Sequence, residues 1–297
     1  MTDQDSDNTT PPSHEDAPGN DVNEETADSP AITEQTPEPD TEAEQYPVAV
    51  ISDIHANLEA LQTVIADIHS RNISRIIFLG DLVGYGPDPR ACIDTVMEHC
   101  EWGLMGNHDF ASLYEPTNFN SRAETASYWT RFELESEPDP QLRAKRWRFL
   151  GQLHIKRKLT EDILCVHGSP RRPINEYIFA EDAAASPTKM KSLFDRIQKY
   201  CLVGHTHVQG VFTEEPAFIY PQEIENRYPF YGSGKCIINV GSVGQPRDRD
   251  PRAGYVILHK QGIEFVRIEY DFEATIEKIA PISDLNNFFG QRLREGR

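Results

Sequence analysis

The first 46 residues contain no lysine or arginine and almost no large apolar side chains. They hold 14 of the 48 acidic residues and six of the 21 prolines, which contributes −14 to the formal net charge of −19. A segment of this composition cannot bury enough apolar surface to offset the entropy that it would lose on ordering. We therefore predict a disordered acidic tail at residues 1–46, followed by a folded domain at residues 47–297.

Other absences narrow the class of protein further. The remaining 251 residues carry 34 acidic against 29 basic side chains, so they lack the basic surface that nonspecific nucleic-acid binding needs. No apolar run has the length of a membrane span, and the acidic N-terminus is unlike a secretory signal. The five cysteines form no CxxC pair and are expected to be small buried hydrophobes. These features predict a cytoplasmic protein that binds neither membrane nor nucleic acid.

The folded part begins with short apolar stretches that alternate with amphipathic ones. Residues 48–51, 76–79 and 102–105 are expected to be strands, and the segments that begin at Asn57 and Asp88 have the caps and apolar spacing of helices. Three strands that alternate with two helices predict parallel βαβ units with right-handed crossovers.

The rest of the chain contains more strands and an inserted helical layer. Residues 112–150 are expected to be helical, residues 163–166 and 201–203 to be strands, and a helix to begin at Ser186. Residues 208–270 are expected to form shorter strands, and residues 272–297 to be partly helical. Polar motifs recur along this whole span, which favours one domain over two.

Five of these motifs follow an apolar stretch directly. They are Asp53-x-His55, Gly80-Asp81, Gly106-Asn107-His108-Asp109, His167-Gly168 and Gly204-His205-Thr206-His207. In open α/β sheets the carboxyl ends of the strands converge on one edge, where ligands bind. Each motif alone is more often a capped turn or a buried histidine with an ordinary partner. Five in succession predict one polar site.

The residue types indicate what this site binds. Aspartate and neutral histidine are suitable ligands for divalent Mn, Fe, Ni or Zn. Seven such ligands are too many for one ion with open positions, but they are about right for two ions that share a carboxylate. Two ions roughly 3.5–4 Å apart can hold a phosphate and lower the pKa of a bridging water. A histidine outside the ligand set can stabilise the transition state or protonate the leaving group.

These five motifs resemble those of the calcineurin-like metallophosphoesterases: D-x-H, G-D, G-N-H-D or E, H, and G-H-x-H. Residues 80–87 and 239–247 are similar to a small prokaryotic branch of this family. The resemblance implies an α/β fold, a four-layer sandwich of two mixed β-sheets flanked by helices. It covers about residues 47–270.

The resemblance also implies a role for each motif residue. Asp53, His55 and His207 would bind the first metal ion, Asp81 would bridge, and Asn107, His167 and His205 would complete the second site. His108 would be the catalytic histidine, oriented by Asp109.

Two arginines are candidate contacts for a substrate phosphate. Arg171 follows the motif at His167, and Arg247 lies in a loop with several charged residues. Salt bridges with neighbouring acidic residues are the alternative role for both.

The predicted function is hydrolysis of phosphoester bonds in a small phosphoester substrate. A protein Ser/Thr phosphatase is the alternative within the same class. A non-catalytic scaffold of the same fold is the alternative outside it, but the complete ligand set and His108 argue against a scaffold.

Overall fold

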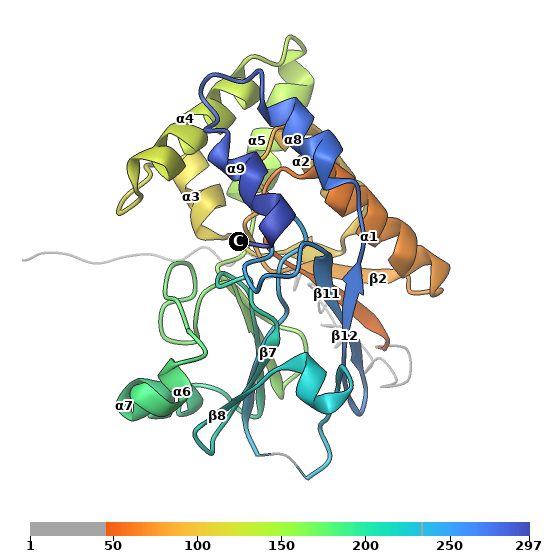
Figure 1. The fold of residues 1–297 in the computed structure, drawn as a ribbon, viewed down its shortest axis with the longest axis vertical. Coiled ribbons are helices and arrows are strands. Elements are labelled where there is room, and N and C mark those ends of the chain that lie inside the picture. Colours follow the sequence, from red (N-terminus) through yellow and green to blue (C-terminus); the bar gives the residue numbers. More distant parts are fainter. Residues whose placement is uncertain (1–45, 233) are drawn as a thin grey trace, which may run out of the picture. The chain divides into compact units, whose positions relative to one another are not determined.

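Two six-stranded β-sheets form the centre of the computed structural model, which describes residues 46–232 and 234–297 (Figure 1). The tail predicted at residues 1–46 lies outside the described residues except for Tyr46. In the described part of the chain, no helix is long and apolar enough to cross a membrane.

The first sheet has the strand order β3-β2-β1-β11-β12-β9. Its strands are β1 (Val48–Ile51), β2 (Arg75–Phe78), β3 (Trp102–Gly103), β9 (Arg227–Pro229), β11 (Ala253–His259) and β12 (Gly262–Ile268). Strands β1, β2 and β3 are parallel, as predicted from the βαβ pattern, and β11 joins β1 in antiparallel orientation. The sheet is therefore mixed.

The second sheet has the order β4-β5-β6-β10-β7-β8. Its strands are β4 (Lys156–Lys158), β5 (Ile163–Val166), β6 (Tyr200–Val203), β7 (Gly210–Thr213), β8 (Ala217–Ile219) and β10 (Cys236–Asn239). Strands β5, β6 and β10 are parallel, and the others pair in antiparallel orientation.

The helices fall into three groups along the chain. Those of the first half are α1 (Leu58–Ser70), α2 (Pro89–His99), α3 (Asn107–Leu113), α4 (Ser121–Glu135) and α5 (Pro140–Gly151). The middle group consists of α6 (Asp182–Ala185), α7 (Pro187–Phe194) and the 3-10 helix η2 (Pro221–Ile224). The C-terminal group consists of α8 (Phe272–Ile279), α9 (Phe288–Gln291) and the 3-10 helix η3 (Arg292–Glu295).

Successive side chains of a strand point to opposite faces of its sheet and therefore pack against different layers. Ala49 and Ile51 of β1 pack toward helices α1 and α2. Val48 and Val50 point the other way and pack against the second sheet. The far face of the second sheet packs on α7, in a cluster that includes Phe194. The result is a four-layer arrangement of helices, two sheets and helices, which confirms the predicted fold class.

One strand boundary needs correction, and two predicted helix caps are found in place. The strand expected at residues 102–105 ends at Gly103, because Leu104 pairs with His154 outside the sheet instead. Asp88 does occupy the N-cap of α2, but its side chain makes no capping bond and binds Lys278 Nζ at 2.9 Å. At α1 the predicted cap is confirmed, since the Asn57 side chain accepts a hydrogen bond from Ala60 N.

Candidate metal centre

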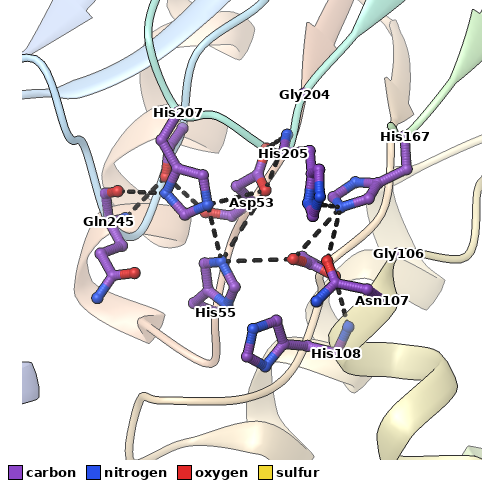
Figure 2. A network of polar contacts seen from close by, with 12 residues as sticks. Asp53, His55, Gly106, Asn107, His108, His167, Gly204, His205, His207 and Gln245 are labelled. Atoms are coloured by element: carbon purple, nitrogen blue, oxygen red, sulfur yellow. Dashed lines mark hydrogen bonds and ion pairs between the residues drawn. The ribbon is translucent and has the colours of Figure 1, made fainter. Parts of the chain in front are cut away.

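The seven predicted ligands all lie in loops at the carboxyl ends of strands or at the helix that follows one. Asp53 and His55 follow β1, Asp81 follows β2, and Asn107 begins α3. His167 follows β5 of the second sheet, and His205 and His207 follow β6. Both sheets therefore contribute side chains to one site (Figure 2).

The first group of candidate ligands consists of Asp53, His55, Asp81 and His207, whose ligand atoms all lie within 4.8 Å of one another. His207 Nε2 lies 3.1 Å from Asp53 Oδ1 and 3.2 Å from His55 Nε2. His55 Nε2 lies 3.7 Å from Asp81 Oδ2. All four side chains are buried.

The second group consists of Asp81, His167 and His205. His167 Nε2 lies 3.3 Å from Asp81 Oδ2, 3.1 Å from His205 Nδ1 and 3.3 Å from Asn107 Oδ1. Asn107 therefore lies beside this group, and the structure brings all seven predicted ligands together. Asp81 belongs to both groups.

The histidine nitrogens are arranged for a cation. The Nδ1–H groups of His167 and His207 donate to the backbone oxygens of Leu79 and Gln245, which leaves each Nε2 lone pair free to bind. Each of these Nε2 atoms faces another histidine nitrogen, at 3.1 and 3.2 Å. Two facing lone pairs repel each other unless a proton or a metal ion lies between them. The donor set thus fits divalent metal ions.

The loops that carry the ligands have an unusual backbone. Five candidate ligands have a positive φ angle: Asp53 (52°), His55 (49°), Asp81 (53°), His205 (69°) and His207 (63°). Such conformations cost about 1–3 kcal/mol each for non-glycine residues and are found most often at functional sites. The fold thus keeps these loops in a strained shape that points the side chains together.

Two glycines allow the loops to approach one another. A Cβ atom on Gly106 would lie 2.1 Å from Asp81 Oδ1, and one on Gly204 would lie 2.5 Å from Asp53 Oδ2. Any larger residue at either position would displace a candidate ligand.

The charges of the cluster are strongly coupled. Burial raises the pKa of Asp53 and Asp81, but the charges and hydrogen bonds of the neighbouring histidines together outweigh burial. Both carboxyls therefore have a pKa well below the usual value. Burial alone lowers the pKa of His167, but the charges of Asp81 and Asp53 raise it to about 9. Burial lowers the pKa of His55 and His205. Without metal, the cluster therefore holds a proton at His167.

His108 lies beside the ligand groups without belonging to either. Its ring centroid lies 4.9 Å from that of His55, 4.3 Å from that of Tyr85 and 4.7 Å from that of Phe119. Its Nδ1 atom has no hydrogen-bond partner among the described residues. Burial, with the charge of Arg247, lowers its pKa to about 4. The imidazole is therefore neutral at pH 7 and free to bind another molecule.

Asp109 has a different position from the one that its predicted role implies. Its carboxylate accepts hydrogen bonds from the backbone N–H groups of Leu82, Val83 and Gly106, at 2.9, 3.2 and 2.9 Å. No hydrogen bond joins it to the His108 imidazole among the described residues. Asp109 thus fixes the two loops that carry Asp81 and His108, and it acts on His108 through the backbone.

A cavity of about 490 Å³ opens next to the second ligand group. Its lining includes the candidate ligands Asn107 and His205, together with Phe119, Arg172 and Tyr177. Tyr177 stacks on His205 with ring centroids 3.7 Å apart. Sequence reasoning missed Phe119 and Tyr177, because nothing in the spacing of these loop residues distinguishes them from ordinary surface aromatics.

The two predicted substrate contacts differ in their surroundings. Arg171 pairs with Glu176 and does not line this cavity, although its neighbour Arg172 does. Arg247 donates a hydrogen bond to Gln245 Oε1 at 3.0 Å, and its charge lowers the pKa of His108 and His207. Arg247 therefore lies at the site, whereas Arg171 forms a salt bridge with Glu176.

Comparison with known proteins agrees with the fold and the site. The family model of calcineurin-like phosphoesterases matches residues 46–209. A metallophosphoesterase of Sphaerobacter thermophilus is 34% identical, with a TM-score of 0.68 over 85% of this chain and 100% of that chain. An uncharacterized protein of Methanocaldococcus jannaschii is 35% identical over 84% of this chain and 98% of its own.

A hypothetical protein of Pyrococcus horikoshii has the same fold, with a TM-score of 0.65 at 18% identity over 84% of this chain and 98% of that chain. Fold and site together define a phosphoesterase of the metal-dependent class. The chain belongs to the calcineurin-like phosphoesterase family.

Proposed function

We propose that this protein hydrolyses phosphoester bonds of a small substrate with two divalent metal ions, Mn, Fe, Ni or Zn. Asp53, His55 and His207 would hold one ion, and Asn107, His167 and His205 the other. The observation that carries this proposal is the position of Asp81, whose carboxylate belongs to both ligand groups. A shared carboxylate is the feature that distinguishes a two-ion site from two separate ones.

When bound, such ions would lower the pKa of a water molecule and so supply the nucleophile for hydrolysis. The residues of this chain supply the remaining functions. His108 lies outside both ligand groups, and its pKa of about 4 keeps it neutral. The neutral imidazole would donate its N–H to an oxygen of the reacting phosphate and so stabilise the transition state. Asp109 would hold the loops of Asp81 and His108 in register.

The cavity supports a small substrate over a phosphoprotein. Its volume of about 490 Å³ lies within the range typical of small-molecule sites. Phe119 and Tyr177 offer aromatic surfaces to a leaving group.

The proposal is tested by turnover and metal content together. Purified full-length protein is assayed with p-nitrophenyl phosphate and bis-p-nitrophenyl phosphate after addition of Mn²⁺, Ni²⁺, Fe²⁺ or Zn²⁺. We expect release of nitrophenol with at least one metal, and loss of that activity with a chelator. A protein that binds the ions but turns over neither ester with any metal would instead be a scaffold.

A further inference from the structure

A second cationic group lies near the site and comes from the last helical segment. Arg292, the first residue of η3, places its guanidinium over the ring of Tyr85 at 4.8 Å and over the ring of Phe289 at 5.3 Å. Its Nε and Nη2 atoms are buried and have no hydrogen-bond partner among the described residues. Two donors of a permanently charged side chain are therefore left without an acceptor.

Arg247 is close enough to affect Arg292 electrostatically. Burial, together with the charge of Arg247, lowers the pKa of Arg292 to about 10. Arg247 also has a buried Nε atom without a partner among the described residues. Neither arginine forms a salt bridge in the part of the chain that the structure describes.

Neighbouring arginines behave differently, which makes this pair unusual. Arg252 pairs with Asp250, Arg267 with Asp248 and Arg294 with Glu273. Two like charges held near each other, with three unsatisfied N–H nitrogens, are unfavourable unless an anion binds to them. Among the residues that the structure describes, no carboxylate forms an ion pair with Arg247 or Arg292.

Each arginine contacts a residue of the site: the backbone N–H of Arg247 donates to His207 O at 3.4 Å, and Arg292 lies over Tyr85. The Tyr85 ring, on which the Arg292 guanidinium stacks, has its centroid 4.3 Å from that of His108 and 4.8 Å from that of His55. The charge of Arg247 acts on His108 and His207. Neither arginine lines the 490 Å³ cavity at Asn107 and His205. Arg247 instead lines a neighbouring cavity of about 260 Å³, together with Tyr177.

The number of phosphate oxygens decides which substrate fits. A phosphodiester has two non-ester oxygens, whose charge the metal ions would neutralise. A phosphomonoester has a third, which guanidinium groups bind well. We propose that Arg247 and Arg292 form an anion subsite that binds the third phosphoryl oxygen, so that the site prefers phosphomonoesters to diesters. This inference rests on the proposed phosphoesterase function.

The test compares one substitution on two substrates. Arg292→Met keeps an apolar stem for the aromatic rings but removes the charge, and Arg294→Met on the same segment is the control, since Arg294 pairs with Glu273 at the surface. For the metal-loaded full chain we expect Arg292→Met to lower kcat/KM for p-nitrophenyl phosphate at least about tenfold, the loss of one charge-assisted hydrogen bond. With bis-p-nitrophenyl phosphate the change should stay within about threefold. Arg294→Met should change neither value.

Binding of inorganic phosphate, measured by calorimetry, separates this inference from the proposed function. Arg292→Met and Arg247→Met should each weaken phosphate binding about tenfold or more. That loss would support the anion subsite even if the wild-type chain turned over neither ester. An equal fall for both esters, or unchanged phosphate affinity in both variants, would overturn it. If Arg292→Met fails to fold, Arg247→Met still tests the proposal, because it keeps the contacts of Arg292 with Tyr85 and Phe289.

Discussion

Asp81 is the residue on which the two-ion interpretation depends. Its Oδ2 lies 3.7 Å from His55 Nε2 and 3.3 Å from His167 Nε2, one histidine from each ligand group. We expect Asp81→Asn to deplete both ions, because the bridging charge is shared. His55→Ala is the matched comparison and should lose roughly one ion of the two. Metal analysis of the purified variants measures this. Equal losses in both variants would remove Asp81 from the bridge.

His108 gives a second prediction for a single residue, because it contacts the ligand groups without joining them. His108→Ala should lower kcat by about two to three orders of magnitude, the usual loss for one transition-state donor, with metal content unchanged. His69→Ala, at the exposed C-terminal end of α1, should have no effect on either quantity. If His108→Ala released the ions, the histidine would be a ligand and its assigned role would fail.

The proton held by His167 predicts how metal affinity depends on pH. The pKa of His167 is raised from its ordinary 6.5 to about 9 in the metal-free fold, so a metal ion must displace a proton below that pH. Affinity should rise about tenfold per pH unit toward pH 9. The free energy of unfolding of the metal-free protein should depend on pH in the opposite direction. Protonated His167 stabilises this form fully below pH 6.5, and the stabilisation is lost as the pH rises through 9. Calorimetric titration with Mn²⁺ at pH 6, 7 and 8 tests the first trend, and a flat profile would contradict it.

The loop between β3 and α3 gives a prediction about a structural element. Gly106→Ala would place a Cβ atom 2.2 Å from Asp81 N and 2.1 Å from Asp81 Oδ1. We expect this substitution to lower both metal content and melting temperature. Gly151→Ala is the control at the end of α5, where a Cβ atom meets nothing within 4 Å. It should stabilise the fold by about 0.5 kcal/mol, because alanine loses less backbone entropy on folding. A destabilised Gly151→Ala would show that the end of α5 is constrained in another way.

Elements with strong local signals could be predicted from the sequence. Strands β1 and β2 are short apolar runs, and α1 has both a capping asparagine and helical apolar spacing. Strand β3 could not be bounded, because its end depends on the pairing of Leu104 with His154, fifty residues away. Likewise, Asp88 binds Lys278 instead of its own helix. Long-range contacts decided both outcomes.

The site also contains residues that could be predicted from local signals and residues that could not. Residues in motifs directly after strands are close together in the structure, because parallel strands bring their carboxyl ends to one edge. Arg292 belongs to no motif and reaches Tyr85 only because the C-terminal helices fold back beside the first half of the chain (Figure 1). Such a contact has no local signature in the sequence.

For the whole molecule, the acidic segment gives a test of domain organisation. We expect deletion of residues 1–46 to leave kcat/KM and melting temperature nearly unchanged, because this segment has almost no apolar surface to contribute to a core. The comparison uses the full chain in the same buffer at moderate salt, where unscreened charge effects are small. A large drop in either quantity would show that the segment packs on the folded part.

The ligand set also has a mechanical meaning. Asp53, His55 and Asp81 follow strands of one sheet, whereas His167, His205 and His207 follow strands of the other. Each ion would therefore be bound by residues from both sheets and would stabilise the folded state. The stabilisation is about 4 kcal/mol when the free metal concentration is a thousandfold above Kd. Substitutions that empty the site should then shorten the lifetime of the protein in a cell as well as silence it. A screen that measures activity alone would not distinguish a variant that is folded but inactive from one that has been degraded.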